Sequence, residues 1–404
     1  MSMLYELRDR GVWEAFLKSK IERRHLSEKE KEVWGSFISE EKYRSVTERM
    51  LQSDYIFEPP AKISVNKSGT NKKRIVYSFS EEESMVLKLM SHLMYRYDYK
   101  ISPRCFSFRR DSSAKEAITQ ILKMKNLDGK YCLKIDISNY FNSIPVKGLT
   151  EVLEQIIDDD KMLLQFLVRL LSDGRAYEDG KLICEDRGAM AGIPIAPFFA
   201  NIYLLSMDNE FERRGIDYFR YSDDIVIFAD SKEQLEEYEN LLRLYITEKG
   251  LEINPQKVSR SKPGEGWEFL GFAFRDGKVD LSRVTINKMK AKIRRKAHTV
   301  YRRRIRRKWD FVYAGKALIK VFNKKYFDET QENRFTWSRW FFPVLTTDEG
   351  LKELDAYLIQ YVRYLYRGRH YKGNYKVTYD QIKQMGFRSL VHEYYKGKED
   401  GFSK

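Results

Sequence analysis

The chain has 404 residues, of which 42% are hydrophobic and 33% charged, and its formal net charge is +15 at pH 7. This composition is typical of a folded chain with a large core, and the length predicts two or three domains. No stretch approaches about 18 consecutive apolar residues, so no transmembrane helix is predicted, and the charged N-terminus lacks the apolar core of a signal peptide. Three widely spaced cysteines favour a reducing cytoplasm over a disulfide framework or a structural zinc site.

The predicted elements change character along the chain. The first fifty residues predict two charged helices around Trp13 and Trp34, and residues 51–80 predict two strands separated by a polar turn. From residue 130 the order of strands and helices suits an antiparallel sheet backed by helices, which predicts an α+β fold, and beyond residue 281 we expect basic helices. Between these regions we predict helices at 82–97, 112–125, within 146–172, at 197–211 and at 231–250, and strands at 130–137, 217–221, 225–229, near 257–259 and near 267–272.

Positive charge is concentrated in the C-terminal part of the chain. The segment 283–308 contains 13 Lys or Arg and no Asp or Glu, and tyrosines interleave with arginines at 363–375. Basic clusters mixed with aromatic residues suit phosphate contacts combined with base stacking, which indicates nucleic-acid binding. The alternative is a basic surface that serves solubility, although a solvated helix normally mixes both signs. The candidate RNA-binding residues are Arg294, Arg295, Arg302, Arg303, Arg304, Arg306 and Arg307.

Three acidic residues lie at the ends of predicted apolar strands. Asp136 ends one strand, and Asp223 and Asp224 join the two strands of a predicted hairpin. If these strands are neighbours, about 4.8 Å apart, their carboxylates are able to share divalent cations, and a pair of such ions is the usual arrangement for displacing a phosphate in line. The alternative is that the two adjacent aspartates only form a turn, because Asp is common in turns.

Five segments resemble motifs of reverse transcriptases, and they follow the order and spacing of that family from about residue 60 to residue 275. The resemblance implies a right-hand polymerase with fingers, an antiparallel-sheet palm and a helical basic thumb. Its domains would be an N-terminal helical segment at 1–50, fingers at 51–130, a palm at 131–280 that contains finger insertions, and a thumb with a C-terminal RNA-binding region at 281–404. The five segments are 134–144, 188–201, 219–228, 250–257 and 269–271.

The resemblance also implies roles for the acidic residues. Asp136 and Asp223 would be the principal ligands of two Mg²⁺ ions, with Mn²⁺ as an alternative. Asp224 would support them, and the backbone carbonyl of Ile137 would add a ligand. Lys257 matches a lysine that the family places near the leaving pyrophosphate, although by itself it is an ordinary surface lysine.

Further residues match positions that bind the dNTP in this family. Phe141 lies where an aromatic ring crowds the 2′ position of the sugar and so excludes ribonucleotides; the alternative is a core phenylalanine. Lys67 and Arg74 flank the turn that resembles the hairpin gripping the triphosphate, where two cations would balance the developing charge. Because two further lysines lie close by at 72–73, the lysine that contacts the triphosphate stays open. Arg109 matches a contact to template or nucleotide, with a surface arginine as the equal alternative.

One motif departs from the family pattern. The family usually has Pro-Gln-Gly where this chain has Met-Ala-Gly at 190–192, and Ala196 replaces the usual Ser. The glutamine amide normally contacts the incoming nucleotide, and the methyl group of Ala191 offers no hydrogen bond. We therefore expect catalysis to be retained, whereas nucleotide selection is in question.

The C-terminal segments 337–343, 355–365 and 386–396 resemble bacterial defence-associated reverse transcriptases, which are related to group II intron and retron enzymes. This resemblance implies an RNA-directed DNA polymerase that extends a 3′ or protein hydroxyl with dNTPs in antiphage defence. Its partners would be an RNA template, expected to be a dedicated structured non-coding RNA, the DNA product and dNTPs, with no membrane. Oligomer formation stays open. The alternatives are a retron-type or template-independent DNA polymerase and, from another class, an RNA-binding scaffold with an inactive palm.

Overall fold

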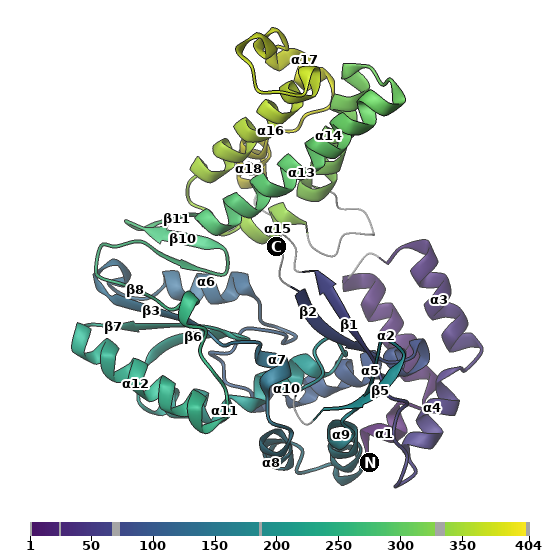
Figure 1. The fold of residues 1–404 in the computed structure, drawn as a ribbon. Helices are drawn as coiled ribbons and strands as arrows, with labels where there is room; N and C mark the ends of the chain where they lie inside the picture. The colour runs from purple at the N-terminus through teal and green to yellow at the C-terminus, as the bar shows by residue number, and fades with distance from the viewer. Residues whose placement is uncertain (1, 24–25, 67–72, 186–187, 328–335, 401–404) are drawn as a thin grey trace. The chain divides into compact units, whose positions relative to one another are not determined.

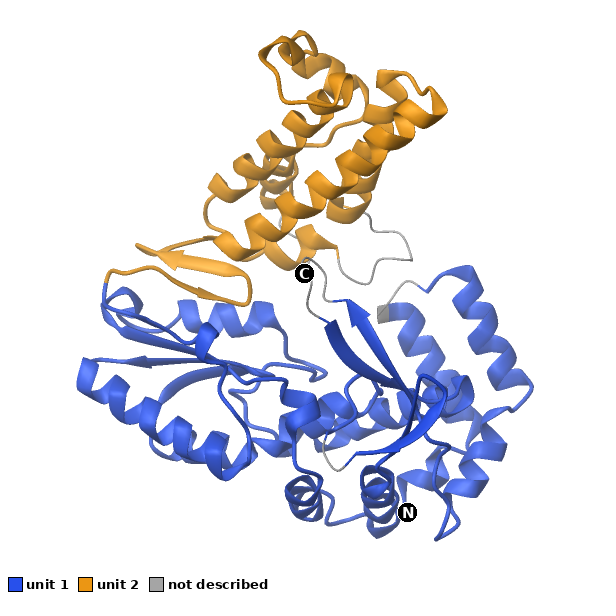
Figure 2. Cartoon of the chain, viewed as in Figure 1, with its two compact units in different colours: residues 1–263 blue, residues 264–404 orange. Residues whose placement is uncertain are grey.

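Helices and strands occur in separate runs along the chain, and the strands pair almost entirely antiparallel (Figure 1), which confirms the predicted α+β class. The computed structural model describes residues 2–23, 26–66, 73–185, 188–327 and 336–400. The chain forms two compact units, residues 1–263 and residues 264–404 (Figure 2). Across the described residues, no helix has both the length and the apolar character that crossing a membrane requires.

Four helices, where the sequence predicted two, surround a cluster of aromatic rings at the start of unit 1. Trp13 stacks on Tyr43 with ring centroids 5.0 Å apart and lies 6.5 Å from Trp34. The two additional helices are short, so the sequence offers few turns over which an apolar period could be recognised. The four are α1 (Met3–Glu6), α2 (Arg10–Arg23), α3 (Glu28–Ser39) and α4 (Tyr43–Met50).

The first sheet of unit 1 combines two hairpins that are far apart in the sequence. The first hairpin confirms the two predicted strands, and a single parallel pair between Ala61 and Tyr177 joins it to the second hairpin. The second hairpin was not predicted, because its short strands are largely exposed and therefore lack an apolar alternation. The strands are β1 (Ala61–Asn66), β2 (Lys73–Ser78), β4 (Arg175–Glu178) and β5 (Lys181–Cys184), in the order β2-β1-β4-β5.

The second sheet is antiparallel throughout and has a buried core of Ile, Val, Leu and Phe side chains. Helix α12 (Lys232–Glu248) packs against its central strands. As predicted, this helix begins where the Ser231 hydroxyl accepts the Gln234 N–H, and it ends just before Gly250, which has a φ of +67°. The strands are β3 (Tyr131–Asp136), β6 (Asp217–Tyr221), β7 (Asp224–Ala229) and β8 (Ser259–Ser261), in the order β6-β7-β3-β8.

The remaining elements of unit 1 are helices that surround the two sheets. Most overlap a predicted helix, with the helix predicted at 197–211 divided in two, but the short helical segments at 127–129, 140–143 and 255–257 were not predicted. These elements are α5 (Glu81–Leu93), η1 (Met94–Lys100), α6 (Ala114–Leu122), η2 (Leu127–Gly129), α7 (Tyr140–Ser143), α8 (Val146–Ile156), α9 (Lys161–Ser172), α10 (Ala196–Tyr203), α11 (Leu205–Arg213) and η3 (Pro255–Lys257).

Unit 2 is mostly helical and basic, as predicted. It opens with a three-stranded antiparallel sheet, which the sequence analysis assigned to the end of the palm, and its two longest helices pack against each other. The finer domain boundaries stay predictions. The elements are β9 (Trp267–Phe269), β10 (Phe272–Arg275), β11 (Lys278–Leu281), α13 (Arg283–Arg307), α14 (Phe311–Phe327), α15 (Trp337–Phe341), α16 (Glu349–Arg367), η4 (Lys372–Lys376), α17 (Tyr379–Gln384) and α18 (Leu390–Glu399).

Candidate active site

The strand register of the second sheet brings the three acidic residues to one end of that sheet. Asp136, the last residue of β3, pairs with Asp224, the first residue of β7. Asp223 precedes it in the turn, and its carbonyl accepts the Ile137 N–H at 3.1 Å. The neighbouring strands that the sequence predicted are therefore present, and the segment with Ile137, the predicted carbonyl ligand, lies directly beside the turn.

Two lysines and the burial of the site set its electrostatics. The Lys257 ammonium lies 2.5 Å from Oδ2 of the buried Asp136, and the Lys134 ammonium lies 3.6 Å from Oδ1 of Asp224. Burial, and then the negative charges of Asp224 and Asp136, raise the pKa of Asp223 to about 6. Burial also raises the pKa of Asp224, and the positive charge of Lys134 opposes this shift. The turn thus holds more negative charge than its lysines neutralise.

The donor set fits hard divalent cations, which prefer carboxylate oxygen ligands. Within the described ranges, no three His, Cys, Asp or Glu side chains are already arranged around a common point in a way that could hold a metal ion. The ion pair between Lys257 and Asp136 supplies part of the physical reason, because an ammonium occupies the side of the carboxylate that a cation would otherwise contact.

A buried polar network holds the turn that carries the aspartates. Ser222 has a φ of +60°, and its N–H donates to the Ser107 hydroxyl at 2.9 Å. That hydroxyl in turn donates to Oδ1 of Asn201 at 2.9 Å, and the Asn201 amide donates to the Ser107 carbonyl at 2.7 Å. All three residues are buried. The sequence analysis missed this network, because its members lie on three separate segments.

A buried ion pair anchors the neighbouring strand β6. Arg220, fully buried, donates through Nε to Oδ1 of the equally buried Asp208 at 2.9 Å and also bonds its second carboxylate oxygen. The Arg220 backbone pairs with the extended segment that precedes Ser107, through bonds of 2.9 Å to Arg104 and Phe106. The segment 104–106 therefore forms an edge of the sheet that carries the aspartates.

The predicted dNTP-binding segments also meet. The Ala191 carbonyl accepts the Tyr77 N–H of β2 at 2.7 Å, and the Ala191 N–H donates to Oδ1 of Asn142 at 3.3 Å. The Asn142 amide reaches the Ile75 carbonyl at 3.3 Å, so one side chain links the hairpin to the altered motif. Arg74 is exposed on β2, whereas Lys67 lies outside the described residues.

Phe141 stands at the border of the hydrophobic core. Its half-buried ring contacts Phe108 edge-to-face at 6.1 Å and Tyr140 at 5.9 Å, and Phe108 also contacts Tyr221 beside the aspartates. Phe108 is 43% exposed and has a φ of +54°. The ring of Phe141 thus has one side against the core and one side in an aromatic cluster, and its predicted role in sugar selection stays a prediction.

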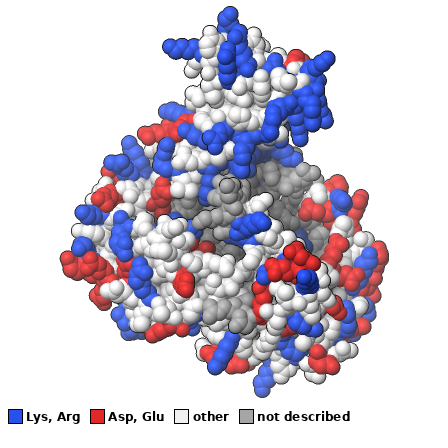
Figure 3. Space-filling view, in the orientation of Figure 1, with Lys and Arg blue, Asp and Glu red and all other residues white. Residues whose placement is uncertain are grey.

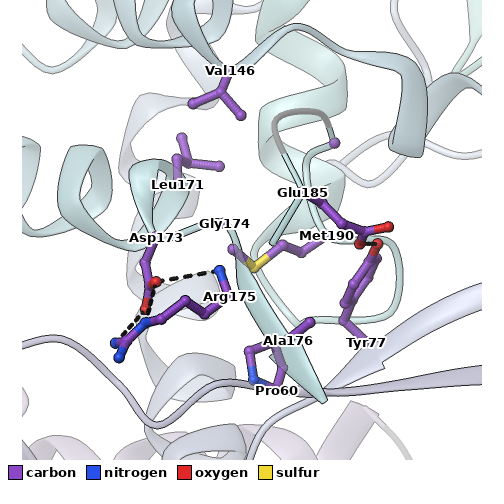
Figure 4. Close-up of a pocket in the computed structure, with 11 residues that line it drawn as sticks. Pro60, Tyr77, Val146, Leu171, Asp173, Gly174, Arg175, Ala176, Glu185 and Met190 are labelled. Carbon is purple, nitrogen blue, oxygen red and sulfur yellow. Dashed lines mark hydrogen bonds and ion pairs between the residues drawn. The ribbon is translucent and has the colours of Figure 1, made fainter. Parts of the chain in front are cut away.

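The first residue of the altered motif is a packing residue. Met190 has a φ of +50° and is buried, and it lines a small cavity together with Tyr77, Glu185 and Leu171 (Figure 4). The Tyr77 hydroxyl donates to Glu185, which also binds the Lys62 ammonium at 2.7 Å. The Met190 side chain, which replaces the usual proline, therefore contributes to the packing beside the first sheet.

Two arginines that were predicted to contact nucleic acid or nucleotide form hydrogen bonds with backbone carbonyls of the protein instead. The Arg109 guanidinium donates to the carbonyls of Ser102 at 2.8 Å, Cys105 at 3.3 Å and Asp98 at 3.2 Å, so in this structure it holds its own loop. Arg304 donates to the Leu365 and Tyr366 carbonyls at the end of α16. The other six predicted arginines of α13 are exposed, namely Arg294, Arg295, Arg302, Arg303, Arg306 and Arg307.

An antiparallel sheet with paired carboxylates at a hairpin, backed by helices, defines the palm of a right-hand nucleic-acid polymerase. Residues 65–274, just over half of the chain, match the family model described as reverse transcriptase (RNA-dependent DNA polymerase). The chain therefore belongs to the reverse transcriptase family and is a nucleotidyltransferase of the RNA-directed DNA polymerase class.

Individual relatives agree with this family. The chain is 24% identical over 238 residues to the retron Ec86 reverse transcriptase of Escherichia coli, a match that covers 57% of this chain and 68% of that protein. It is 27% identical over 117 residues to the retron Mx65 reverse transcriptase of Myxococcus xanthus, covering 28% of this chain and only 27% of that relative.

Similar solved structures include two telomerases. Apo telomerase from Candida tropicalis is 12% identical with a TM-score of 0.43, and the match covers 84% of this chain and 68% of that one. Telomerase from Candida albicans, in complex with a TWJ fragment of telomeric RNA, is 11% identical with a TM-score of 0.44, and the match covers 88% of this chain and 65% of that one.

Proposed function

We propose that this protein copies RNA into DNA by a two-metal mechanism and that unit 2 holds a dedicated structured RNA. The observation that carries the catalytic part is the register of β3 and β7, which places Asp136 opposite Asp224 with Asp223 in the adjoining turn. The raised pKa of Asp223 supports a cation site, because a divalent ion would relieve the repulsion among the three carboxylates.

We assign the proposed roles of the site residues mainly from their charges. Asp136, Asp223 and Asp224 would hold two Mg²⁺ ions, which when bound lower the pKa of the attacking hydroxyl and balance charge on the phosphoryl group. Lys257, 54% exposed at its side chain, would give up Asp136 to the cation and neutralise the pyrophosphate. Arg74 would contact the triphosphate, and Phe141 would exclude the 2′-hydroxyl.

Primer extension tests the catalytic proposal directly. The wild-type chain should extend an RNA-templated DNA primer with Mg²⁺ and dNTPs, and Asp223→Ala combined with Asp224→Ala should lower the rate by more than about a hundredfold. Asp230→Ala is the matched control, because Asp230 follows the opposite end of β7 and pairs with Lys130 at 2.8 Å. Synthesis by the double variant at near wild-type rate would exclude the two-metal assignment.

The same assay separates the remaining alternatives. Synthesis without a template would indicate a template-independent polymerase, and absence of synthesis with retained RNA binding would indicate a scaffold. A product that stays attached to the protein after denaturation would indicate priming by a protein hydroxyl.

Sequencing of the RNA that copurifies with the protein tests for a dedicated RNA. One enriched transcript would support a dedicated RNA, and a random sample of cellular RNA would contradict it.

We further propose a role in antiphage defence, supported by the C-terminal segments that resemble defence-associated enzymes. Cells that express the wild-type protein with its neighbouring non-coding sequence should reduce phage plating relative to cells that express the double aspartate variant. Equal plating over a diverse panel of phages would contradict this role.

A further inference from the structure

Unit 2 contains a cavity that the catalytic proposal does not use. It measures about 450 Å³ and lies between the start of α14, the end of α16, the end of η4 and helix α17. This volume falls within the range of pockets that hold small molecules and single nucleotides. The cavity is therefore large enough for one nucleobase and too small for a helix or a duplex.

The walls of the cavity are fixed by contacts within unit 2. The Arg363 Nε donates to the Val377 carbonyl at 3.0 Å, which ties α16 to the segment after η4. Gly315 allows α14 to approach α17, because a Cβ atom there would lie 2.5 Å from the Met385 sulfur. The Asn323 amide donates to the Gly386 carbonyl at 2.7 Å. The cavity is thus formed before any ligand binds, which lowers the entropic cost of binding.

The chemistry of the walls suits a flat, polar-edged ligand. The Phe311 ring contacts the Tyr366 ring edge-to-face with centroids 5.4 Å apart, and the Arg367 guanidinium lies 5.6 Å from the centroid of the Tyr366 ring. Tyr366 is 38% exposed and lines the cavity, so part of its ring is open to a stacking partner beside that cation. Val312, Val377 and Met385 add apolar surface.

Polar groups at the cavity provide hydrogen bonds and positive charge. Gln381 uses its side-chain oxygen to accept the Thr378 N–H at 3.1 Å, which leaves its NH₂ group as a donor, and Gln384 contributes a second amide. Lys316 and Lys376 line the cavity as well, and no acidic residue lines it. Amides that read base edges, an aromatic face and cations for flanking phosphates together match an unpaired nucleotide.

The surroundings supply the attraction for a polyanion. Phe311 follows the basic end of α13 by four residues, and that end presents Arg302, Arg303, Arg306 and Arg307 to solvent. In the space-filling view, most of the charged side chains visible on unit 2 are Lys and Arg (Figure 3). Arg304 bonds the carbonyls of Leu365 and Tyr366, so the arginine-rich turn lies directly beside the wall that carries Tyr366.

We infer that this cavity captures one unpaired base of the RNA that the protein binds, with the flanking phosphates held by the basic end of α13. The inference rests on the proposed RNA-binding function of unit 2. RNA is favoured over DNA as the occupant, because newly made DNA stays paired with its template, whereas a structured RNA presents bases in loops and bulges. Unit 2 would therefore recognise a position in the RNA and not only its charge.

Binding of defined RNAs to the full-length, nucleic-acid-free protein tests the inference. The probes are a fluorescein-labelled RNA hairpin with a six-nucleotide loop, the same stem as a blunt duplex, and a DNA hairpin of identical sequence, all at matched salt. Tyr366→Ala should weaken binding of the RNA hairpin by about tenfold through loss of stacking and leave duplex binding unchanged. Tyr366→Phe keeps the ring and should bind like the wild type.

A second variant guards against a folding defect. Val312 is 47% exposed, so Val312→Trp should fill the cavity without disturbing the core and should weaken hairpin binding to a similar extent. Tyr395→Ala, an exposed tyrosine of α18 that does not line the cavity, is the matched control. A 4-thiouridine in the loop should crosslink to the segment 311–316 or to Tyr366.

The outcomes separate this inference from the polymerase proposal. Binding is measured without dNTPs, and the double aspartate variant should keep the hairpin preference even though it does not synthesise DNA. Equal affinity for hairpin and duplex, unchanged by both cavity variants, would overturn the inference and leave only charge-driven binding. Preference for the DNA hairpin would overturn the assignment to RNA, and a crosslink outside unit 2 would overturn the site.

Discussion

The two units differ sharply in how they balance charge. Residues 1–263 contain 42 Lys and Arg against 43 Asp and Glu, whereas residues 264–404 contain 32 against 16. The whole positive excess of the protein thus resides in unit 2. In unit 1 the buried charges meet partners within the chain, as in the pairs of Arg220 with Asp208 and Lys257 with Asp136.

In unit 2, positive side chains lie close enough to one another to repel. Burial, and then the positive charges of Lys325 and Arg295, lower the pKa of Lys292 on α13. Glu353 is an acid that does pair with this helix, through Arg283 at 2.6 Å and Lys290 at 2.5 Å. Like charges on one helix repel unless a polyanion is near. The comparison teaches that unit 1 balances its charge overall, with a local excess of negative charge at the aspartate turn, whereas unit 2 carries an excess of positive charge that a polyanion would balance.

Removal of one buried charge should have the largest effect on unit 1. Asp208→Asn leaves Arg220 buried without a counter-charge and should lower the free energy of unfolding by about 3–5 kcal/mol. Urea denaturation measures it, and Asp208→Leu combined with Arg220→Met should recover most of the loss. Asp230→Asn, which breaks an exposed pair, should cost less than about 1 kcal/mol. Equal costs for the two sites would contradict the importance of burial.

Removal of four charges from unit 2 should instead change binding and spare stability. The variant replaces four exposed arginines by Gln, namely Arg302, Arg303, Arg306 and Arg307. The slope of log binding constant against log salt concentration should become shallower by roughly 0.7–0.9 for each phosphate contact that is lost. Arg304 is left intact, because its guanidinium bonds the end of α16. The matched control replaces four exposed lysines of unit 1 by Gln, namely Lys29, Lys147, Lys161 and Lys181. If both variants show the same slope, RNA binding is not localised to α13.

Within unit 1, an uncharged residue should set the choice of sugar. Phe141→Ala removes one ring of the cluster and should lower the preference for dNTP over rNTP by at least about tenfold, because a steric barrier is lost while the carboxylates stay. The measurement is the ratio of the two kcat/KM values in single-nucleotide extension. Phe16→Ala, which removes a buried ring from the N-terminal cluster, is the control. An unchanged ratio would assign Phe141 to core packing alone.

The hydroxyl that supports the aspartate turn should have a smaller effect. Ser107→Ala leaves the Ser222 N–H without its acceptor, which costs about 1–2 kcal/mol, and we expect about a tenfold lower kcat with little change in the KM for dNTP. A purely structural role would lower the stability without this split between kcat and KM. Thr150→Ala, which removes a hydroxyl that bonds only its own helix, serves as the control.

The smallest effect should come from removing one of the repelling carboxylates. Asp223→Asn should raise the melting temperature by about 2–4 °C in EDTA, because burial and two neighbouring negative charges disfavour the charged form. Mg²⁺ should stabilise the wild type and reverse this order. A lower melting temperature for the variant in EDTA would show that the repulsion is already relieved within the chain.

Sequence patterns predicted the palm because its strands are buried and apolar. The strands that carry Asp136 and Asp224 were visible for this reason, and so was the helix between Ser231 and Gly250. The hairpin β4–β5 was missed, because its side chains are mostly exposed. The links from Ser107 to Asn201 and to Ser222 were also missed, because a hydrogen bond between distant segments leaves no periodic signal.

Arginines were the least predictable residues of the site. Arg109 and Arg304 looked the same in the sequence as their exposed neighbours, yet both donate to backbone carbonyls. Their long side chains reach acceptors whose positions depend on the tertiary fold. The departure at 190–192 was visible in the sequence, but the packing of the Met190 side chain required the structure.

The backbone at Ala191 has a consequence for how copying errors can evolve. Its N–H is held by Asn142 and its carbonyl by Tyr77, so the position of this residue is set by the surrounding chain and not by its own side chain. Ala191 is only 9% exposed, so a longer side chain such as Gln would also have to fit the packing around it. The proposed role of this position in nucleotide selection is therefore tied to the stability of the fold.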